Sequence, residues 1–286
     1  MIVITGANGG LGNGVVRGLL ARGVPAGELV AAVRTPAKAA DLAALGVTVR
    51  EADYDRPETL GPAFADARRL LLVSSVGTEE TRVRQHLAAV EAARVAGVEL
   101  LAYTSVVNAD TNPLALAEAH RATERAIAAS GLPSVLLRNG WYNENHLTRL
   151  STAVATGELP GSAGEGRIAF AARADYAEAA AEVLTLDDQA GRVHELTGPT
   201  AWSLAELAAE AARITGRPVA YRDLPGERFA EALRGAGLPE FVVELLVDVD
   251  LRVAGGVLET VTDELPKLLG RPATPPSATL AEALRA

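Results

Sequence analysis

The chain has 286 residues, a net charge of -9 and a pI near 5.1, and 49% of its residues are hydrophobic. This acidic balance argues against nucleic-acid binding, because neutralising phosphate needs clustered lysine and arginine. No run reaches the roughly 18 apolar residues that a membrane span requires. Cysteine is absent and the four histidines match no metal-binding spacing. We therefore expect no disulfide, no thiol nucleophile and no metal site.

The first residues give an expectation about the compartment. Strand-forming residues begin at position 2, without the basic segment and apolar core that a signal peptide has. The cytoplasm is therefore the expected location.

Short β-branched runs alternate with amphipathic helical stretches from residue 2 to about 138. Strands are expected at 2–5, 29–33, 47–50, 70–74, 99–104 and 134–138. The alternation predicts an α/β fold with a doubly wound parallel sheet, covered by helices on both faces. The nearly continuous apolarity of these runs is typical of strands that are buried on both faces.

Apolar residues recur at helical spacing in two of the connections: Leu11, Val15 and Leu19, and then Val83, Leu87 and Val90. We expect each set to form the buried stripe of a helix. In the second helix, Arg82 and Arg84 form the longest basic cluster, on a face of mixed charge. Thr35 before Pro36 predicts a helix start, and Gly46 predicts a helix end.

The pattern changes after residue 139. The stretch NGWYNENH at 139–146 leads into a glycine-rich connection, expected to be loop and short strand. A helix over 173–186 and a strand over 192–197 are expected to return the chain to the sheet, whereas the last part favours helix, with a capping-box pattern at Ser203 and Glu206. We expect a main domain over 1–139, completed by about 168–198, and a smaller, mainly helical substrate lobe over 140–167 and 199–286.

Glycines 6, 9 and 12 lie between the first strand and the first helix with the spacing G-x-x-G-x-x-G. They permit a tight turn, close approach of main chain to a pyrophosphate, and close packing of helix on sheet. The helix start adds free N–H groups and a positive dipole end. The junction is typical of a Rossmann-like fold and predicts a dinucleotide at Gly6, Ala7, Asn8, Gly9, Gly10, Leu11 and Gly12. A tight turn without a ligand is the alternative.

Arg34 follows the second strand, and Lys38 lies one helical turn further on. An acid at this place usually meets the ribose hydroxyl of NAD, whereas a 2′-phosphate needs a cation. Because a guanidinium can grip phosphate with its planar fork, the sequence favours NADPH over NADH. A solvated arginine at a strand edge is the alternative.

Two further strand ends point to the same edge of the sheet. Asp53 is expected to hydrogen-bond adenine and Tyr54 to pack beside it. After the fourth strand, the small residues Ser74, Ser75 and Val76 are expected to let main chain lie along the nicotinamide ribose. All of these residues are equally common in ordinary loops.

Six segments together resemble the NmrA-like branch of the atypical short-chain dehydrogenase/reductases, and within it the bacterial NAD(P)H:quinone oxidoreductase 2 type. They are TGANGGLG (5–12), AAVRTPAK (31–38), ADYD (52–55), LLAYTS (100–105), LLRNGWYNEN (136–145) and RADYAEAAA (173–181). The resemblance implies two-electron reduction of quinones by NADPH without flavin. It also implies cofactor contacts along Ser74, Ser75 and Val76, at Asn139, Gly140, Trp141, Tyr142, Asn143 and Glu144, and at Arg173.

The chain departs from ordinary short-chain dehydrogenases, which use a Tyr-x-x-x-Lys pair as proton donor and activator. Leu116 and His120 fall at those two positions. We expect direct hydride transfer to a quinone, with Tyr142 beside the ring and Asn143 as a hydrogen-bonding group, and His120 is the candidate proton donor. A packing role for His120, and core roles for Trp141 and Tyr142, are the alternatives. An NmrA-type redox sensor that binds NADP without turnover is the alternative function.

Overall fold

The computed structural model describes residues 1–285, and its contacts divide the chain into two compact units. Unit 1 consists of Met1–Asp110, Glu118–Asn139 and Ala174–Glu195. Unit 2 consists of Thr111–Ala117, Gly140–Arg173 and Leu196–Ala286. Both units are therefore built from separate stretches of the chain.

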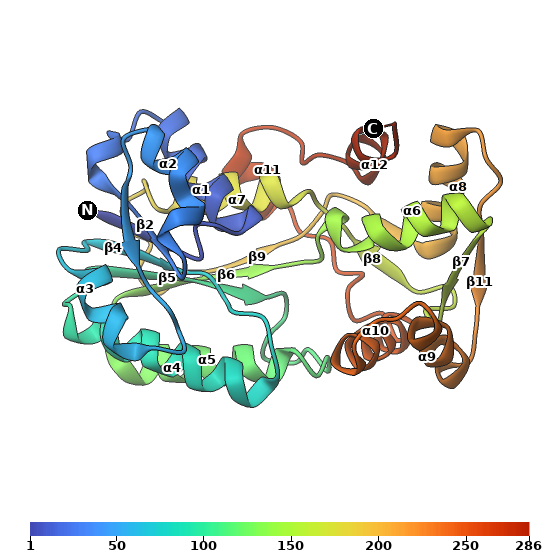
Figure 1. Cartoon of the computed structure of the whole chain (residues 1–286), viewed down its shortest axis with the longest axis horizontal. Helices are drawn as coiled ribbons and strands as arrows, with labels where there is room; N and C mark the ends of the chain where they lie inside the picture. Colours follow the sequence, from blue (N-terminus) through green and yellow to red (C-terminus); the bar gives the residue numbers. More distant parts are fainter. Residues whose placement is uncertain (286) are drawn as a thin grey trace. The chain divides into compact units, whose positions relative to one another are not determined.

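Unit 1 contains a seven-stranded sheet with the order β3-β2-β1-β4-β5-β6-β9 (Figure 1). The strands are β1 (Ile2–Thr5), β2 (Leu29–Val33), β3 (Thr48–Glu51), β4 (Arg69–Leu72), β5 (Leu100–Val106), β6 (Ser134–Asn139) and β9 (Val193–Leu196). The pairings from β3 through β6 are parallel. The six expected strands and the return of the chain at 192–197 are confirmed, with ends shifted by one or two residues.

Helices cover both faces of this sheet (Figure 1). One face carries α1 (Gly10–Ala21), α2 (Ala40–Ala44) and α7 (Arg173–Val183), and the other carries α3 (Leu60–Phe64), α4 (Glu79–Val95) and α5 (Ala117–Ser130). Every residue of β2 and β5 is buried. The expected doubly wound, Rossmann-like α/β fold is confirmed.

Helices α1 and α7 are in close contact through small residues. A Cβ atom added at Gly14 would lie 2.8 Å from Cβ of Ala177, and one added at Gly18 would lie 3.0 Å from Cβ of Ala181. A side chain at either glycine would force the helices apart, because interiors are packed without spare room. The two glycines therefore set how closely α7 approaches α1.

Helix α4 differs from the sequence-based expectation. Val90 is buried, but Val83 is only half-buried and Leu87 is 42% exposed. Besides Ala89, Val90 and Ala93, the buried face carries the polar residues Arg82, Gln85 and His86. The interpretation of Arg82 as part of a mixed-charge surface was wrong, because its guanidinium has hydrogen-bonding partners inside unit 1.

The helix punctuation is mostly as expected. A 3₁₀ turn (Pro36–Ala39) begins after Thr35 and precedes α2, although the Thr35 side chain makes no capping hydrogen bond. Gly46, with a φ of 84°, follows α2. The capping box of Ser203 and Glu206 is confirmed, with both reciprocal hydrogen bonds present.

Unit 2 is mainly helical and holds two small sheets. Strand β7 (Glu158–Gly161) pairs in parallel with β11 (Ala220–Asp223), and β8 (Arg167–Ala169) pairs antiparallel with β10 (Ala201–Ser203). Its helices are α6 (Leu147–Thr156), α8 (Leu204–Thr215), α9 (Gly226–Gly235), α10 (Glu240–Val253), α11 (Glu264–Leu269) and α12 (Pro276–Arg285).

A buried ion pair fixes part of unit 2. Both guanidinium Nη atoms of Arg149 lie 3.1–3.2 Å from the carboxylate oxygens of Asp250, which is 1% exposed. The same carboxylate accepts a hydrogen bond from the Ser162 N–H at 3.0 Å. The pair thereby ties α6 and α10 to the end of β7.

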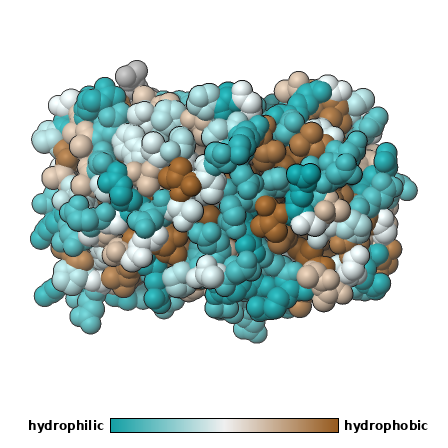
Figure 2. Space-filling model, turned by 180° about the vertical axis from the view of Figure 1, so that it is seen from behind, coloured by the Kyte–Doolittle hydropathy of each residue, from teal (hydrophilic) through white to brown (hydrophobic). Residues whose placement is uncertain are grey.

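The displayed surface is mainly hydrophilic, and hydrophobic residues appear in small separate groups (Figure 2). Among the described residues, the helices are all too short or too polar to span a bilayer.

Candidate functional site

The glycine-rich junction between β1 and α1 is a tight turn that only glycine can form at two points. Gly6 has a φ of 60°, which side-chain-bearing residues rarely adopt. A Cβ at Gly12 would lie 2.6 Å from the carbonyl oxygen of Gly6 and 2.8 Å from its carbonyl carbon. The N–H of Gly9 donates to the same Gly6 oxygen at 2.9 Å. The turn therefore folds directly against the first turn of α1.

The first turn of α1 offers unpaired main-chain N–H groups, as every helix start does, and no side chain caps it. Gly9 and Gly10 are exposed, so a ligand can approach this main chain without meeting a side chain. Free amides and a positive helix end suit the diphosphate of a dinucleotide. The residues present at this junction thus fit such a cofactor.

Hydrogen bonds link the loops at the carboxyl ends of four neighbouring strands. Oγ1 of Thr5, at the end of β1, accepts from the Val73 N–H at 2.8 Å and lies 2.6 Å from the Tyr54 hydroxyl. The Asn8 side-chain amide donates to the Thr35 carbonyl at 3.1 Å. The predicted residues after β1, β2, β3 and β4 are therefore brought to one edge of the sheet.

Arg34 and Lys38 are exposed beside the glycine junction. Within residues 1–285 neither side chain forms a hydrogen bond or an ion pair with the protein. A guanidinium that lies beside the glycine junction and forms no ion pair within 4 Å in the described part of the chain suits a phosphate group, although, after the hydrogen bond from Gln85, its charge also contributes to lowering the pKa of Asp55.

Asp53 and Tyr54 both form bonds within unit 1. The Asp53 carboxylate accepts from the Asp55 N–H at 3.1 Å and lies 3.4 Å from Nε of Arg56. Burial raises the pKa of the Tyr54 hydroxyl, which stays protonated. Their expected contacts with adenine remain predictions.

The loop after β4 is held by side chains from neighbouring elements. The N–H of Ser74 donates to Oγ1 of Thr104 at 2.9 Å, and the N–H of Ser75 donates to Nε2 of His86 at 2.9 Å. Val76 follows and is 90% exposed. An apolar side chain in this position is available to a ligand at the sheet edge.

His120 is buried on α5, with 5% of its surface exposed. Its Nε2 lies 2.9 Å from Nη2 of Arg82, and its Nδ1 lies 2.8 Å from the Tyr103 hydroxyl. Burial, followed by the charge of Arg82, lowers the pKa of His120 well below its usual value. The ring is therefore neutral at neutral pH, a state that does not favour the proposed role of proton donor.

The predicted residues of unit 2 lie together around the start of α7. The Tyr142 ring lies 5.5 Å from the Arg173 guanidinium, and the Glu144 carboxylate accepts from the Arg173 N–H at 2.9 Å. Trp141 Nε1 donates to Nε2 of His146 at 3.2 Å. Within this segment, Glu144 thus holds the first turn of α7.

Asn143 is 4% exposed, and its side-chain amide donates to Oγ1 of Thr279 at 2.9 Å. Its Oδ1 atom is buried and makes no hydrogen bond within the described residues. Sequence reasoning missed Thr279, because 136 residues separate the two and no local pattern marks the pair.

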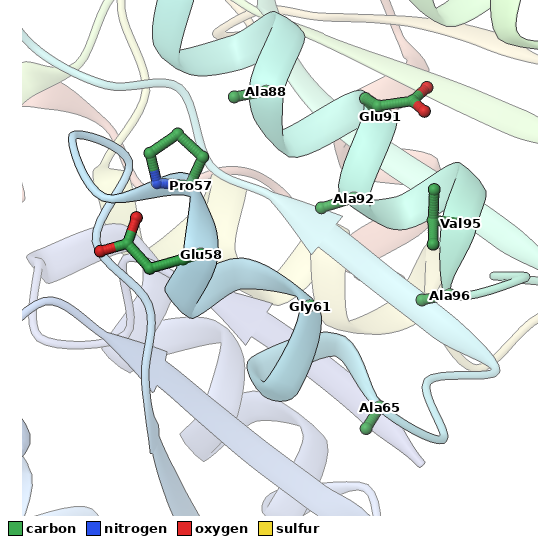
Figure 3. A pocket seen from close by; sticks show the side chains of 9 residues that line it. All are labelled: Pro57, Glu58, Gly61, Ala65, Ala88, Glu91, Ala92, Val95 and Ala96. Atoms are coloured by element: carbon green, nitrogen blue, oxygen red, sulfur yellow. The ribbon is translucent and has the colours of Figure 1, made fainter.

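A shallow groove on unit 1 lies between α3 and α4 (Figure 3). It is lined by Pro57, Glu58, Gly61, Ala65, Ala88, Glu91, Ala92, Val95 and Ala96. None of the predicted site residues lines it, so it is separate from the glycine junction. Within residues 1–285 there is also no group of three or more histidine or acidic residues placed to hold a metal ion.

Comparison with known proteins agrees with the interpretation of the glycine junction as fitting a dinucleotide. Residues 6–187 match the model of a family described as NAD(P)H-binding. The chain belongs to this NAD(P)H-binding family. The matched region begins at Gly6, the first glycine of the junction, and extends past the end of α7.

Relatives of this NAD(P)H-binding protein match nearly its whole length. It is 46% identical to quinone oxidoreductase 2 of Escherichia coli over 284 residues, which cover 99% of this chain and 97% of the relative. It is 31% identical to an NmrA-like family domain-containing oxidoreductase of Aspergillus flavus, over 96% of this chain and 92% of the relative. The resemblance to the NmrA-like branch is confirmed.

A solved structure is similarly close. The NADPH-dependent quinone oxidoreductase of Escherichia coli, crystallised with NADPH, aligns with a TM-score of 0.95 and 45% identity, covering 99% of each chain. The expected fold is thus confirmed over the whole length of this NAD(P)H-binding protein.

Proposed function

We propose that this chain is an oxidoreductase that uses NADPH to reduce quinones by two electrons without flavin. The observation that supports this most directly is its 46% identity, over 99% of its length, to a quinone oxidoreductase. The solved relative holds NADPH, and this chain has a glycine junction that fits the same kind of cofactor.

In this proposal the loops of unit 1 bind the cofactor. The main-chain N–H groups at the start of α1 bind the diphosphate, and Arg34 binds the 2′-phosphate, with Lys38 as a second cation nearby. Asp53, Tyr54 and the segment from Ser74 to Val76 line the same edge. The bound cofactor supplies a hydride, and the protein supplies orientation.

The acceptor is a quinone, which takes up the hydride and one proton and becomes a hydroquinone, while NADPH becomes NADP⁺. Because the product anion is aromatic, the reaction needs less help from a protein acid than alcohol chemistry does. This agrees with Leu116 and His120 standing where other dehydrogenases have tyrosine and lysine. Because burial and Arg82 keep the His120 ring neutral, we infer that water supplies the proton to the quinone.

The predicted cofactor contacts of residues 139–144 rest mainly on the resemblance to the NmrA-like branch. Asn139 is the last residue of β6 in unit 1, and Gly140 follows it and leads into Trp141, Tyr142, Asn143 and Glu144 of unit 2. The buried Oδ1 atom of Asn143 has no protein partner within the described residues and is therefore suited to accept a hydrogen bond from a ligand amide. Asn143→Ala is therefore expected to raise the NADPH Kd measured by calorimetry.

The test is to mix the purified protein with NADPH and a soluble benzoquinone and to follow the absorbance of reduced nicotinamide. We expect oxidation of NADPH above the uncatalysed rate, and slower oxidation of NADH. Calorimetric binding of NADPH without any catalysed oxidation would contradict the enzyme and favour the NmrA-type redox sensor. Absence of binding would contradict both functions.

A further inference from the structure

Both polar main-chain groups of Ser75, in the loop after β4, are bound by side chains of the buried face of α4. The N–H of Ser75 donates to Nε2 of His86 at 2.9 Å, and its carbonyl accepts from Nε of Arg82 at 2.9 Å. His86 is fully buried and Arg82 is 8% exposed. Loops usually satisfy such groups with water or neighbouring main chain, so this arrangement fixes one residue unusually firmly.

Arg82 and His86 are connected through His120 and Tyr103, whose hydroxyl lies 2.8 Å from Nδ1 of His120 and 3.5 Å from Nδ1 of His86. Nη2 of Arg82 donates to Nε2 of His120 at 2.9 Å, so the hydrogen of that ring is on Nδ1, which lies 2.8 Å from the Tyr103 hydroxyl. Thr123 donates its hydroxyl hydrogen to the Ala119 carbonyl at 2.7 Å.

That bond leaves the Thr123 oxygen as an acceptor for Nδ1 of His86, at 2.8 Å. The hydrogen of the His86 ring is therefore on Nδ1, and its Nε2 is the lone-pair acceptor that the Ser75 N–H requires. The network thus sets the tautomers of both histidines, and the one on His86 matches the loop.

The loop that contains Ser75 lies at the carboxyl edge of the sheet, where a cofactor can bind. The strand order 3-2-1-4 reverses between β1 and β4, and ligands of open α/β sheets bind in the crevice at such a switch point. Cβ of Val73 lies 3.5 Å from the position that a Cβ of Gly6 would take, so the loop after β4 borders the glycine junction. Val76, next to the fixed residue, is 90% exposed.

We propose that Arg82 and His86, supported by His120, Tyr103 and Thr123, are positioning residues for the nicotinamide cofactor. They hold the main chain of Ser75, and hence the exposed Val76, as the wall of the crevice between β1 and β4. The inference rests on the proposed function and adds to it residues that do not touch the cofactor. Nothing in the residue types of α4 marks this role, because arginine and histidine on a helix are usually exposed.

His86→Leu removes the acceptor for the Ser75 N–H, whereas His86→Gln keeps an amide oxygen close to the place of Nε2. We expect His86→Leu to raise the NADPH Kd, measured by calorimetry, about tenfold, and to raise the NADPH KM equally with every quinone tested. His86→Gln is expected to restore most of the affinity. Leu87→Ala, on the exposed side of the same helix, is the matched control and is expected to bind as the wild type does.

Hydrogen exchange of the Ser75 amide gives a readout that does not depend on the cofactor. Its protection is expected to fall in His86→Leu and to persist in His86→Gln, at a temperature where thermal melting shows all variants to be folded. If the wild type binds NADPH and folded His86→Leu binds it equally well, the positioning role is wrong and the proposed function stands. If the wild type binds no NADPH, the proposed function fails, and the positioning role fails with it.

Discussion

Gly12 is the position at which the cofactor turn can be tested most sharply. In Gly12→Ala, the new Cβ would lie 2.6 Å from the Gly6 carbonyl oxygen, whereas ordinary contacts of this kind begin at 3.4 Å. The turn must therefore retreat by about 0.8 Å, and all the nearest atoms are main chain that cannot rotate away. Overpacking of this kind costs about 1–3 kcal/mol, partly offset by the roughly 1 kcal/mol that alanine gains over glycine in a helix.

We therefore expect Gly12→Ala to lose up to about 2 kcal/mol of unfolding free energy and to bind NADPH at least about tenfold more weakly, because the displaced amides no longer meet the diphosphate. Urea unfolding and calorimetry measure the two effects. Gly27→Ala is the control, since the added Cβ would meet no atom within 4 Å other than those of its own residue and its chain neighbours. A Gly12→Ala protein with wild-type NADPH affinity would refute the assignment of this turn to the diphosphate.

Three further predictions concern charge. Arg34→Ala is expected to weaken NADPH binding about 10- to 100-fold, the value of a charge-assisted hydrogen bond, and to leave NADH binding unchanged in calorimetry; equal losses for both cofactors would contradict a 2′-phosphate contact. Burial lowers the pKa of His86 and of His146 to about 3 from 6.5, so the stability that their neutral forms provide is complete above pH 6.5 and is lost as the pH falls. At pH 5 each of the two histidines is expected to lower the free energy of unfolding by about 2 kcal/mol relative to pH 7. In urea unfolding, a His86→Gln/His146→Gln protein is expected to lose less of this free energy between pH 7 and 5 than the wild type does. Identical losses would refute this. Arg149→Met leaves the buried Asp250 carboxylate unpaired and is expected to cost about 3–5 kcal/mol in urea unfolding, with partial rescue by Asp250→Asn in the same chain; an unchanged midpoint would show that the pair adds nothing.

The sequence predicts the parts of the fold that depend on local pattern. The glycine spacing needs no distant partner, because Gly6, Gly9 and Gly12 act on one another within a single turn. The buried strands are likewise visible as apolar runs. Arg34 follows directly from the end of β2, so its place at the sheet edge is a consequence of strand direction.

The parts that could not be predicted depend on contacts between distant polar groups. On α4, apolar spacing pointed to Val83, Leu87 and Val90, yet only Val90 of these is buried, and the buried face also carries Arg82 and His86. Their burial is tolerated only because Ser75 and groups on β5 and α5 satisfy them, and no periodicity reveals such partners. The residue type of His120 suggested proton transfer, but its surroundings decide its protonation state.

The contact of α1 with α7 has a consequence for how the protein is made. Between the last residue of β6, Asn139, and the return of the chain at Ala174, the ribosome must first produce a stretch that belongs to unit 2. Until then the surface around Gly14 and Gly18 has no covering helix, and β6 is an unprotected sheet edge that β9 later pairs with. A nascent chain interrupted before residue 195 is thus an incomplete nucleotide-binding unit prone to aggregation, and synthesis of the Gly140–Arg173 stretch of unit 2 is a precondition for completing unit 1.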